Sequence, residues 1–269
     1  MVKIDSLSHV GVFVRDQKKA KEFYTKKLGL KVRSLIPKMG YLALGATKGG
    51  EDASLNLWAP TREMWGPDYD DAVKQIGVVT GIGFLTTNLG KTITDLKRRK
   101  VRVEGPGEEG EGRLASIYDP DGNVVFAYEP AKPKVRRAGL LSLDFVTIAT
   151  RDATRAGEFF TKAVGMKGKK LTGERLREYR LTLKGTALAP FTPMKDMYDE
   201  PKDFEEDMSH IGENTSIMFS TRDIYALQEK LMSRGVRFSR KAEKAEWGRI
   251  QADFLDPDDN SYALIQETL

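Results

Sequence analysis

The side chains that most often hold metals or carry out catalysis are scarce in this sequence of 269 residues. It contains two histidines, His9 and His210, and no cysteine. The lack of cysteine excludes disulfide frameworks, thiolate metal sites and cysteine nucleophiles. A catalytic divalent metal needs about three protein donors and one open position. Any such site would therefore have to combine a histidine with carboxylates or amides.

An internal repeat indicates which elements position these residues. At a constant offset of about 136 residues, the second half of the chain echoes the first. The matched pairs include Val10 and Val146, Asp16 and Asp152, Phe23 and Phe159, Gly29 and Gly165, and Asp119 to Asn123 with Asp256 to Asn260. A collinear match of this length predicts two similar domains, which we place at residues 1–131 and 139–269. The prolines and charges of residues 130–139 are typical of a linker.

Each half repeats a smaller pattern of its own. An apolar strand at 10–14 is followed by Asp16, a natural helix N-cap, and by apolar residues at helical spacing up to Gly29. Short β-like runs follow at 31–35, 41–44 and 53–58, and the same order reappears from residue 81. Asp119 to Asn123 has the composition of a hairpin turn. The chain is therefore predicted to be α+β, built of four βαβββ modules.

Charge and composition limit the partners. The net charge is +5, and the basic clusters at 97–100 and 134–137 contain no aromatic residues, so no nucleic acid is expected. No run of about 18 apolar residues occurs, and no membrane span is expected. The N-terminal residues lack the apolar segment of a signal peptide. We expect a cytoplasmic protein whose partner is a small molecule, with self-association into a homo-oligomer as a further possibility.

The modules resemble the vicinal-oxygen-chelate (VOC) superfamily of glyoxalases, bleomycin-resistance proteins and extradiol dioxygenases. The most specific pieces are residues 8–16, Phe23-Tyr24, Leu28-Gly29 and the turn at 119–123. The resemblance implies two tandem VOC domains with curved mixed sheets. In this superfamily two modules pack into a cup that holds a small ligand, and enzymes of the family place a divalent metal there. Fold alone does not name the reaction.

The resemblance also implies where metal ligands would lie, on the first and fourth strands of each module. Those positions are His9, Asn56, Gly81 and Phe126 in the first domain, and Phe145, about Ala187, Ser216 and Ala263 in the second. His9 is the only plausible ligand among them, so we predict no metal and no other cofactor. His210 precedes its strand and should point elsewhere. The carboxylate of Glu129 is one position out of register and should face away from the cup.

Alternation along the strands gives the residues that face each cup. In the first domain these are His9, Gly11, Phe13, Ser54, Asn56, Trp58, Gly81, Gly83, Leu85, Val124, Phe126 and Tyr128. We expect His9 and Asn56 to hydrogen-bond a planar molecule, and Trp58, Phe126 and Tyr128 to pack on it. The second cup should be mostly apolar. Trp65 could close over the ligand or join two modules, and Arg113 is expected in a structural ion pair.

Three functions follow from this pattern. The first is a glyoxalase/bleomycin-resistance-like protein that binds or transforms a small organic molecule in the first-domain cup without a conventional metal centre. The second is an enzyme, a divalent-metal-dependent lyase, isomerase or dioxygenase that uses His9 with carboxylates placed differently from our alignment. The third is a non-catalytic scaffold or assembly protein with filled cups. The sequence leaves open whether modules pair within one chain or between chains.

Overall fold

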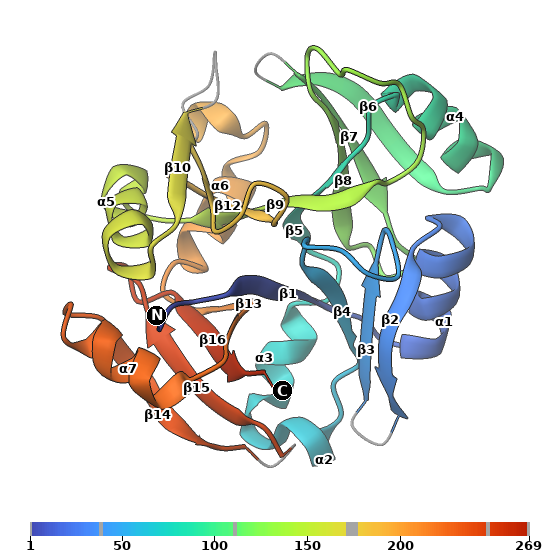
Figure 1. Ribbon diagram of the computed structural model, residues 1–269. Coiled ribbons are helices and arrows are strands. Elements are labelled where there is room, and N and C mark those ends of the chain that lie inside the picture. Colours follow the sequence, from blue (N-terminus) through green and yellow to red (C-terminus); the bar gives the residue numbers. More distant parts are fainter. Residues whose placement is uncertain (1, 38–39, 110–111, 171–176, 246–247, 268–269) are drawn as a thin grey trace. The chain divides into compact units, whose positions relative to one another are not determined.

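The computed structural model describes residues 2–37, 40–109, 112–170, 177–245 and 248–267 (Figure 1). Four modules of one strand, one helix and three strands follow one another, as the repeat predicts. Module 1 consists of β1 (Ser6–Phe13), α1 (Gln17–Glu22) with its continuation η1 (Phe23–Lys27), β2 (Lys31–Ile36), β3 (Tyr41–Gly45) and β4 (Ser54–Trp58). Module 2 consists of β5 (Val79–Leu85), α4 (Leu89–Arg98), β6 (Arg102–Glu109), β7 (Gly112–Tyr118) and β8 (Val124–Glu129). The predicted α+β class is confirmed.

The second half of the chain repeats this order. Module 3 consists of β9 (Ser142–Ala149), α5 (Ala153–Phe159), η4 (Phe160–Val164), β10 (Lys167–Lys170), β11 (Arg177–Arg180) and β12 (Ala187–Phe191). Module 4 consists of β13 (Asn214–Thr221), α7 (Ile224–Met232), β14 (Arg237–Lys244), β15 (Ile250–Leu255) and β16 (Ser261–Gln266). Short helices connect the modules within each half: α2 (Arg62–Trp65), η3 (Gly66–Asp68) and α3 (Tyr69–Lys74), and then η5 (Lys195–Met197) and α6 (Pro201–Ser209). Among the described residues, no helix is long and apolar enough to cross a membrane.

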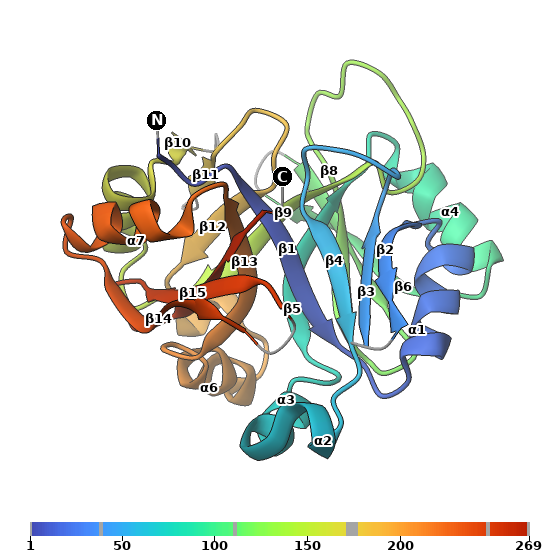
Figure 2. The same cartoon turned by 60° about the horizontal axis from the view of Figure 1, so that its bottom comes forward.

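The strands form two eight-stranded mixed sheets. Their orders are β14-β15-β16-β13-β1-β4-β3-β2 and β10-β11-β12-β9-β5-β8-β7-β6. First and fourth strands of a module pair in parallel, as in β1 with β4 and β5 with β8, whereas neighbouring hairpin strands are antiparallel. Figure 2 shows β1, β4, β3 and β2 side by side in this order.

This strand order differs from one expectation. We expected modules 1 and 2 to share a cup, but module 1 shares its sheet with module 4, and module 2 with module 3. The physical reason lies in the module itself. Each module leaves its first strand with an unpaired edge, and an edge of backbone donors and acceptors can pair with any strand of suitable register. The side-chain pattern that defines a module therefore does not determine its neighbour.

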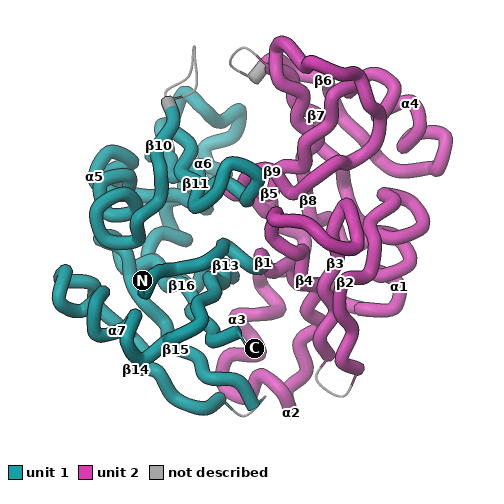
Figure 3. Tube along the Cα trace, in the orientation of Figure 1, with its two compact units in different colours: residues 1–8, 147–269 teal, residues 9–146 magenta. Residues whose placement is uncertain are grey.

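By packing, the chain divides into two compact units (Figure 3). One unit comprises residues 9–146, and the other comprises residues 1–8 with 147–269. Both divisions fall inside strands, β1 and β9. The predicted domain limits of 1–131 and 139–269 stay predictions, because packing in the folded chain does not show where an independently folding domain ends.

The core of module 1 lies on one face of its strands. Val10 and Val12 of β1, Leu55 and Leu57 of β4, and Leu42 and Leu44 of β3 are all buried. Helix α1 contacts β4, and Ala20 and Tyr24 of the helical segment are buried. The helix begins as predicted, with the side chain of Asp16 accepting a hydrogen bond from the Lys19 N–H. Since strand side chains alternate, this packing leaves the other face of the sheet for His9, Asn56 and Trp58.

The predicted turn at 119–123 fixes the end of β1. Asp119 Oδ1 accepts hydrogen bonds from the backbone N–H groups of Asp121 and Asn123, which closes the turn. Asn123 Nδ2 then donates to Asp119 Oδ2 at 2.8 Å and to the carbonyl oxygen of Phe13 at 2.9 Å. Asn123 is fully buried. This buried amide therefore holds the carboxyl end of β1, the strand that carries His9.

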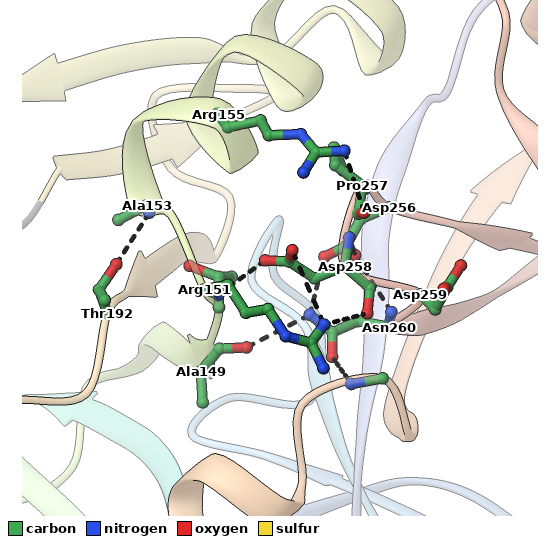
Figure 4. A network of polar contacts seen from close by, with 12 residues as sticks. Ala149, Arg151, Ala153, Arg155, Thr192, Asp256, Pro257, Asp258, Asp259 and Asn260 are labelled. Atoms are coloured by element: carbon green, nitrogen blue, oxygen red, sulfur yellow. Dashed lines mark hydrogen bonds and ion pairs between the residues drawn. The ribbon is translucent and has the colours of Figure 1, made fainter.

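The other unit repeats the arrangement around Asp256 and Asn260 (Figure 4). Asn260 Nδ2 donates to Asp256 Oδ2 at 2.9 Å and to the carbonyl oxygen of Ala149, at the end of β9. Asp258 accepts a hydrogen bond from the backbone N–H of Arg151 at 2.7 Å. In both halves of the chain the turn motif therefore holds the end of a strand, β1 or β9, by hydrogen bonds. This structural role explains why both repeats contain it.

Candidate functional site

The strand register gathers three of the predicted residues on one face. In the parallel pair of β1 and β4, His9 lies opposite Ser54, Gly11 opposite Asn56, and Phe13 opposite Trp58. Strand β3 extends this face, because Ala43 lies opposite Asn56. Residues at alternate positions share a face. Together with Tyr41, two residues before Ala43, these side chains form the surface that we call the β1-β4-β3 face.

His9 and Tyr41 form a hydrogen-bonded pair across this face. The Tyr41 hydroxyl lies 2.8 Å from His9 Nε2, and the two rings meet edge to face with centroids 6.0 Å apart. His9 of β1 lies opposite Ser54 of β4. Because Ala43 lies opposite Asn56, the register of β3 and β4 places Tyr41 opposite Trp58. Asn56 lies between Ser54 and Trp58 on the intervening strand β4. The pair therefore spans Asn56.

Aromatic rings continue from Tyr41 towards the end of the strands. The ring of Tyr41 lies 5.9 Å from that of Trp58, and Trp58 lies 6.2 Å from Trp65. Trp65 in turn packs 5.2 Å from Phe13. All three contacts are edge to face, which is a favourable geometry for aromatic pairs. Trp65 is the last residue of helix α2, so the segment after β4 folds back onto the same face.

Two polar atoms within this surface have no hydrogen-bond partner in the described part of the chain. They are Oδ1 of Asn56 and Nε1 of Trp65, both buried. Asn56 is only 2% exposed. A buried acceptor or donor left without a partner costs about 1–3 kcal/mol of stability, so such groups are rare in native proteins. This pair is the least expected feature of the face.

A buried ion pair borders the face. Arg33 of β2 contacts Asp52 at 2.6 Å, with side-chain exposures of 10% and 6%. Arg33 also donates to the carbonyl oxygen of Asp52 and lies 3.3 Å from the hydroxyl of Ser54. The second oxygen of Asp52 accepts a hydrogen bond from the backbone N–H of Leu143. The guanidinium charge beside the face is therefore neutralised within the protein.

The other two predicted residues lie on the second sheet. Phe126 and Tyr128 belong to β8, opposite Ser116 and Leu114 of β7. Tyr128 packs edge to face against Phe145 at 6.0 Å, and the ring of Phe145 covers Gly83. His9, Asn56 and Trp58 thus lie on one sheet and Phe126 and Tyr128 on the other, and all five belong to the compact unit of residues 9–146. That the five contact one ligand stays a prediction.

Two predictions about charged residues are confirmed. Glu129 is buried and faces away from the strand surface that bears Phe126 and Tyr128. It forms an ion pair with Arg113 and accepts a hydrogen bond from the Leu89 N–H at the start of helix α4. His210, the second histidine, is the C-cap of helix α6 and hydrogen-bonds Glu213 through Nδ1 at 2.8 Å, and its direction relative to the cup stays a prediction.

Sequence reasoning missed residues on the third strands of the modules. Tyr41 is one of them, and Asp253 of β15 in the other unit is another. Asp253 accepts a hydrogen bond from Gln251 Nε2 at 2.8 Å and lies 3.4 Å from Arg240 Nε. Burial raises the pKa of its carboxyl, against the lowering effects of Gln251 and Arg240. Polar residues alternating with buried Ala252 and Phe254 were the available signal.

The donor set on the β1-β4-β3 face does not fit a divalent metal. His9 Nε2 is engaged by Tyr41, and Asn56 offers a neutral amide oxygen. Throughout the described residues, no three histidine, aspartate or glutamate side chains gather as a metal site. Zinc and iron centres need about three donors. What the face offers instead is aromatic surface, one buried hydrogen-bond acceptor and one buried donor.

The family model and the structure of glyoxalase I agree with this fold. The chain matches the model of the Glyoxalase/Bleomycin resistance protein/Dioxygenase superfamily over residues 6–125 and 142–264. Glyoxalase I from Zea mays is 18% identical, with 97% of this chain and 92% of that protein covered and a TM-score of 0.66. TnmS3, an antibiotic binding protein from Streptomyces sp. CB03234, is 30% identical, with 48% of this chain and 99% of that protein covered and a TM-score of 0.40. Among curated proteins, none matches.

Proposed function

The chain belongs to the Glyoxalase/Bleomycin resistance protein/Dioxygenase superfamily, and on this premise we propose that it binds a small organic molecule at the β1-β4-β3 face without a conventional metal centre. The observation that carries the proposal is the buried, unpartnered Oδ1 of Asn56 among aromatic rings. A ligand that donates a hydrogen bond to this oxygen would remove its desolvation penalty of about 1–3 kcal/mol. The rings of Tyr41, Trp58 and Trp65 would pack on the ligand's apolar part.

The same residues support a function without metal. Asn56 stands on the fourth strand and His9 on the first, the places where the resemblance predicts metal ligands. An amide oxygen is a weak ligand for zinc or iron, which prefer imidazole, thiolate and carboxylate. Tyr41 occupies the imidazole nitrogen Nε2. The face therefore favours hydrogen bonding and stacking over chelation.

The alternative within the superfamily is a divalent-metal-dependent lyase, isomerase or dioxygenase. It requires a carboxylate beside His9, whereas the buried carboxylate of Asp52, which borders the face, is held by Arg33 and the Leu143 N–H. Elemental mass spectrometry on protein purified without chelators separates the two functions. About one metal per chain, lost in a His9→Ala variant, would support the enzyme and end the metal-free proposal.

The binding site is tested by a matched pair of variants. A panel of planar aromatic compounds is screened by calorimetry and by quenching of tryptophan fluorescence. For any compound that binds, Asn56→Leu should weaken binding at least tenfold, whereas Phe126→Leu, on the other sheet, should leave it unchanged. Loss of binding in Phe126→Leu with retention in Asn56→Leu would move the site away from the β1-β4-β3 face.

A further inference from the structure

The two unpartnered atoms of the β1-β4-β3 face are complementary in kind. Asn56 Oδ1 can only accept a hydrogen bond, and the indole Nε1–H of Trp65 can only donate one. A ligand that satisfies both must present a donor to Asn56 and an acceptor to Trp65. A purely apolar ring would leave both buried atoms without a hydrogen-bond partner, and their desolvation penalties would remain.

The two atoms also lie on the same face of the same strands. Asn56 precedes Trp58 by two residues on β4, so their side chains point to one side. Trp65 packs its ring on Trp58 and on Phe13, which lie opposite each other in the β1–β4 register. The acceptor and the donor therefore belong to two residues that neighbour Trp58, one along β4 and the other by ring contact.

The surroundings select against charge. The cation beside the face, Arg33, is paired with Asp52, and both side chains are buried. An anionic group would meet the lone pairs of Asn56 Oδ1 and find no uncompensated cation among the side chains described above. Burying an unpaired charge is far more costly than burying a neutral polar group. The rings of Tyr41, Trp58 and Trp65 on this face favour a ligand with a flat, aromatic skeleton.

From these observations we propose that the ligand is a neutral, planar aromatic molecule carrying a hydroxyl or N–H donor and, at a distance, a carbonyl acceptor. Its donor binds Asn56 Oδ1 and its carbonyl accepts from Trp65 Nε1. Since the His9–Tyr41 pair spans Asn56, one of these two rings moves aside when the donor enters. This inference rests on the proposed function and names the chemical class of the ligand.

The test uses the full-length protein and three kinds of probe. The neutral donor-acceptor probes are para-hydroxyacetophenone and umbelliferone; the probes without a donor are their methyl ethers; the anionic probe is para-hydroxybenzoate. Binding is measured by calorimetry in the wild type and in the Asn56→Leu and Trp65→Phe variants. Both substitutions remove a buried unpartnered group, so neither is expected to prevent folding, and circular dichroism confirms the fold of each.

The expected result is a pattern of discrimination. The neutral hydroxy compounds should bind at least tenfold more tightly than their methyl ethers and than the anion. In Asn56→Leu the hydroxy compounds and their ethers should bind with equal affinity, because the oxygen that accepts the ligand's hydrogen bond, Asn56 Oδ1, has been removed. In Trp65→Phe the preference for hydroxyl over ether should persist while all carbonyl probes weaken.

Two different failures are distinguishable. If hydroxy compounds and ethers bind equally in the wild type, or if the anion binds most tightly, the assignment of ligand class is wrong and the proposed function survives. If no probe binds, and naphthalene as a plain aromatic ring also fails to bind, the face is not a site for planar aromatic molecules and both proposals fall.

Discussion

At the residue scale, Asn56 is the position where function and stability should oppose each other. Its Oδ1 is buried without a partner, so replacing the amide by a hydrocarbon of similar size removes a penalty. We expect Asn56→Leu to raise the free energy of unfolding by about 1 kcal/mol. Urea denaturation followed by circular dichroism measures this value. A loss of stability would mean that the amide serves the fold, and the site would lose its main support.

Asn123 is the matched control for that measurement, because it is also a buried asparagine but is fully bonded. It donates to Phe13 and Asp119, and its Oδ1 accepts from the Gly77 N–H at 2.7 Å. Asn123→Leu would remove the hydrogen bonds to Phe13, Asp119 and Gly77 from this buried position, and we expect the free energy of unfolding to fall by at least about 2 kcal/mol. Opposite signs for the two leucine variants would separate the site amide from the structural one.

Asp253 gives a prediction about pH at the same scale. Burial raises the pKa of its carboxyl above the ordinary value of 3.8, so the folded protein takes up this proton before the unfolded chain does. The cost of the buried charge is present at neutral pH and is relieved as the pH falls towards 3.8. Wild type should therefore gain stability relative to Asp253→Asn over that range, as measured by urea denaturation at several pH values.

Asp16 provides the opposite sign in the same titration. The Lys19 N–H lowers the pKa of this exposed N-cap carboxyl, which therefore favours the folded state while it is charged. That contribution is present above pH 3.8 and is lost as the pH falls through the lowered value. On acidification the free energy of unfolding of wild type should therefore fall relative to that of Asp16→Asn, whereas it should rise relative to that of Asp253→Asn. A fall relative to both variants would contradict the assignment for Asp253.

Part of the site could be predicted from residues alone. Alternation along single strands placed His9, Asn56 and Trp58 on one face, and the register confirms this because each pairing in β1 and β4 preserves the alternation. Tyr41 was missed because it lies on a third strand, where the family pattern expects no ligand. Asn56 Oδ1 lacks a hydrogen-bond partner because of how distant residues pack around it. The spacing of residues in the sequence does not predict such packing.

At the element scale, the second sheet carries a tight contact between strands. A side chain at Gly83 of β5 would collide with the ring of Phe145 of β9, which already packs on Tyr128. Gly83→Ala should therefore cost about 1–3 kcal/mol through overpacking. Phe145→Leu in the same chain should recover part of that loss, a coupling that a double-mutant cycle in urea measures.

Gly90 shows what the same substitution does where space is free. It lies in the first turn of helix α4, and a side chain there would meet nothing within 4 Å. Alanine is a better helix former than glycine by at most about 1 kcal/mol, so Gly90→Ala should stabilise the protein. If Gly83→Ala were also stabilising, the close approach of Phe145 to β5 would be wrong.

The elements themselves were largely predictable. Asp16 caps the first helix, and the turn at 119–123 forms where the sequence places it. These features are local, since a capping oxygen or a turn carboxylate binds backbone groups within a few residues. The connection at 61–77 was less predictable, because the return of Trp65 onto Phe13 and Trp58 depends on contacts between distant residues.

At the scale of the whole molecule, the pairing of modules was beyond the sequence. Strand order joins module 1 to module 4 and module 2 to module 3. Particular contacts show this pairing. The Asp5 N–H donates to the Ser220 carbonyl, and Ile82 of β5 lies opposite Val146 of β9. Each contact links the first half of the sequence to the second. Backbone hydrogen bonds carry no side-chain signature, which is why the repeat revealed modules but not their partners.

This pairing predicts the behaviour of the separated halves. If residues 1–138 and 139–269 are produced as two chains, β1 and β5 in one fragment should still pair with β13 and β9 in the other. Unpaired strand edges associate readily, because their buried backbone groups need hydrogen-bond partners. The mixed fragments should therefore form one complex with the mass of the intact protein, as measured by analytical ultracentrifugation. Two separate folded monomers would instead show that each half closes on itself, and the observed strand order would then not govern assembly.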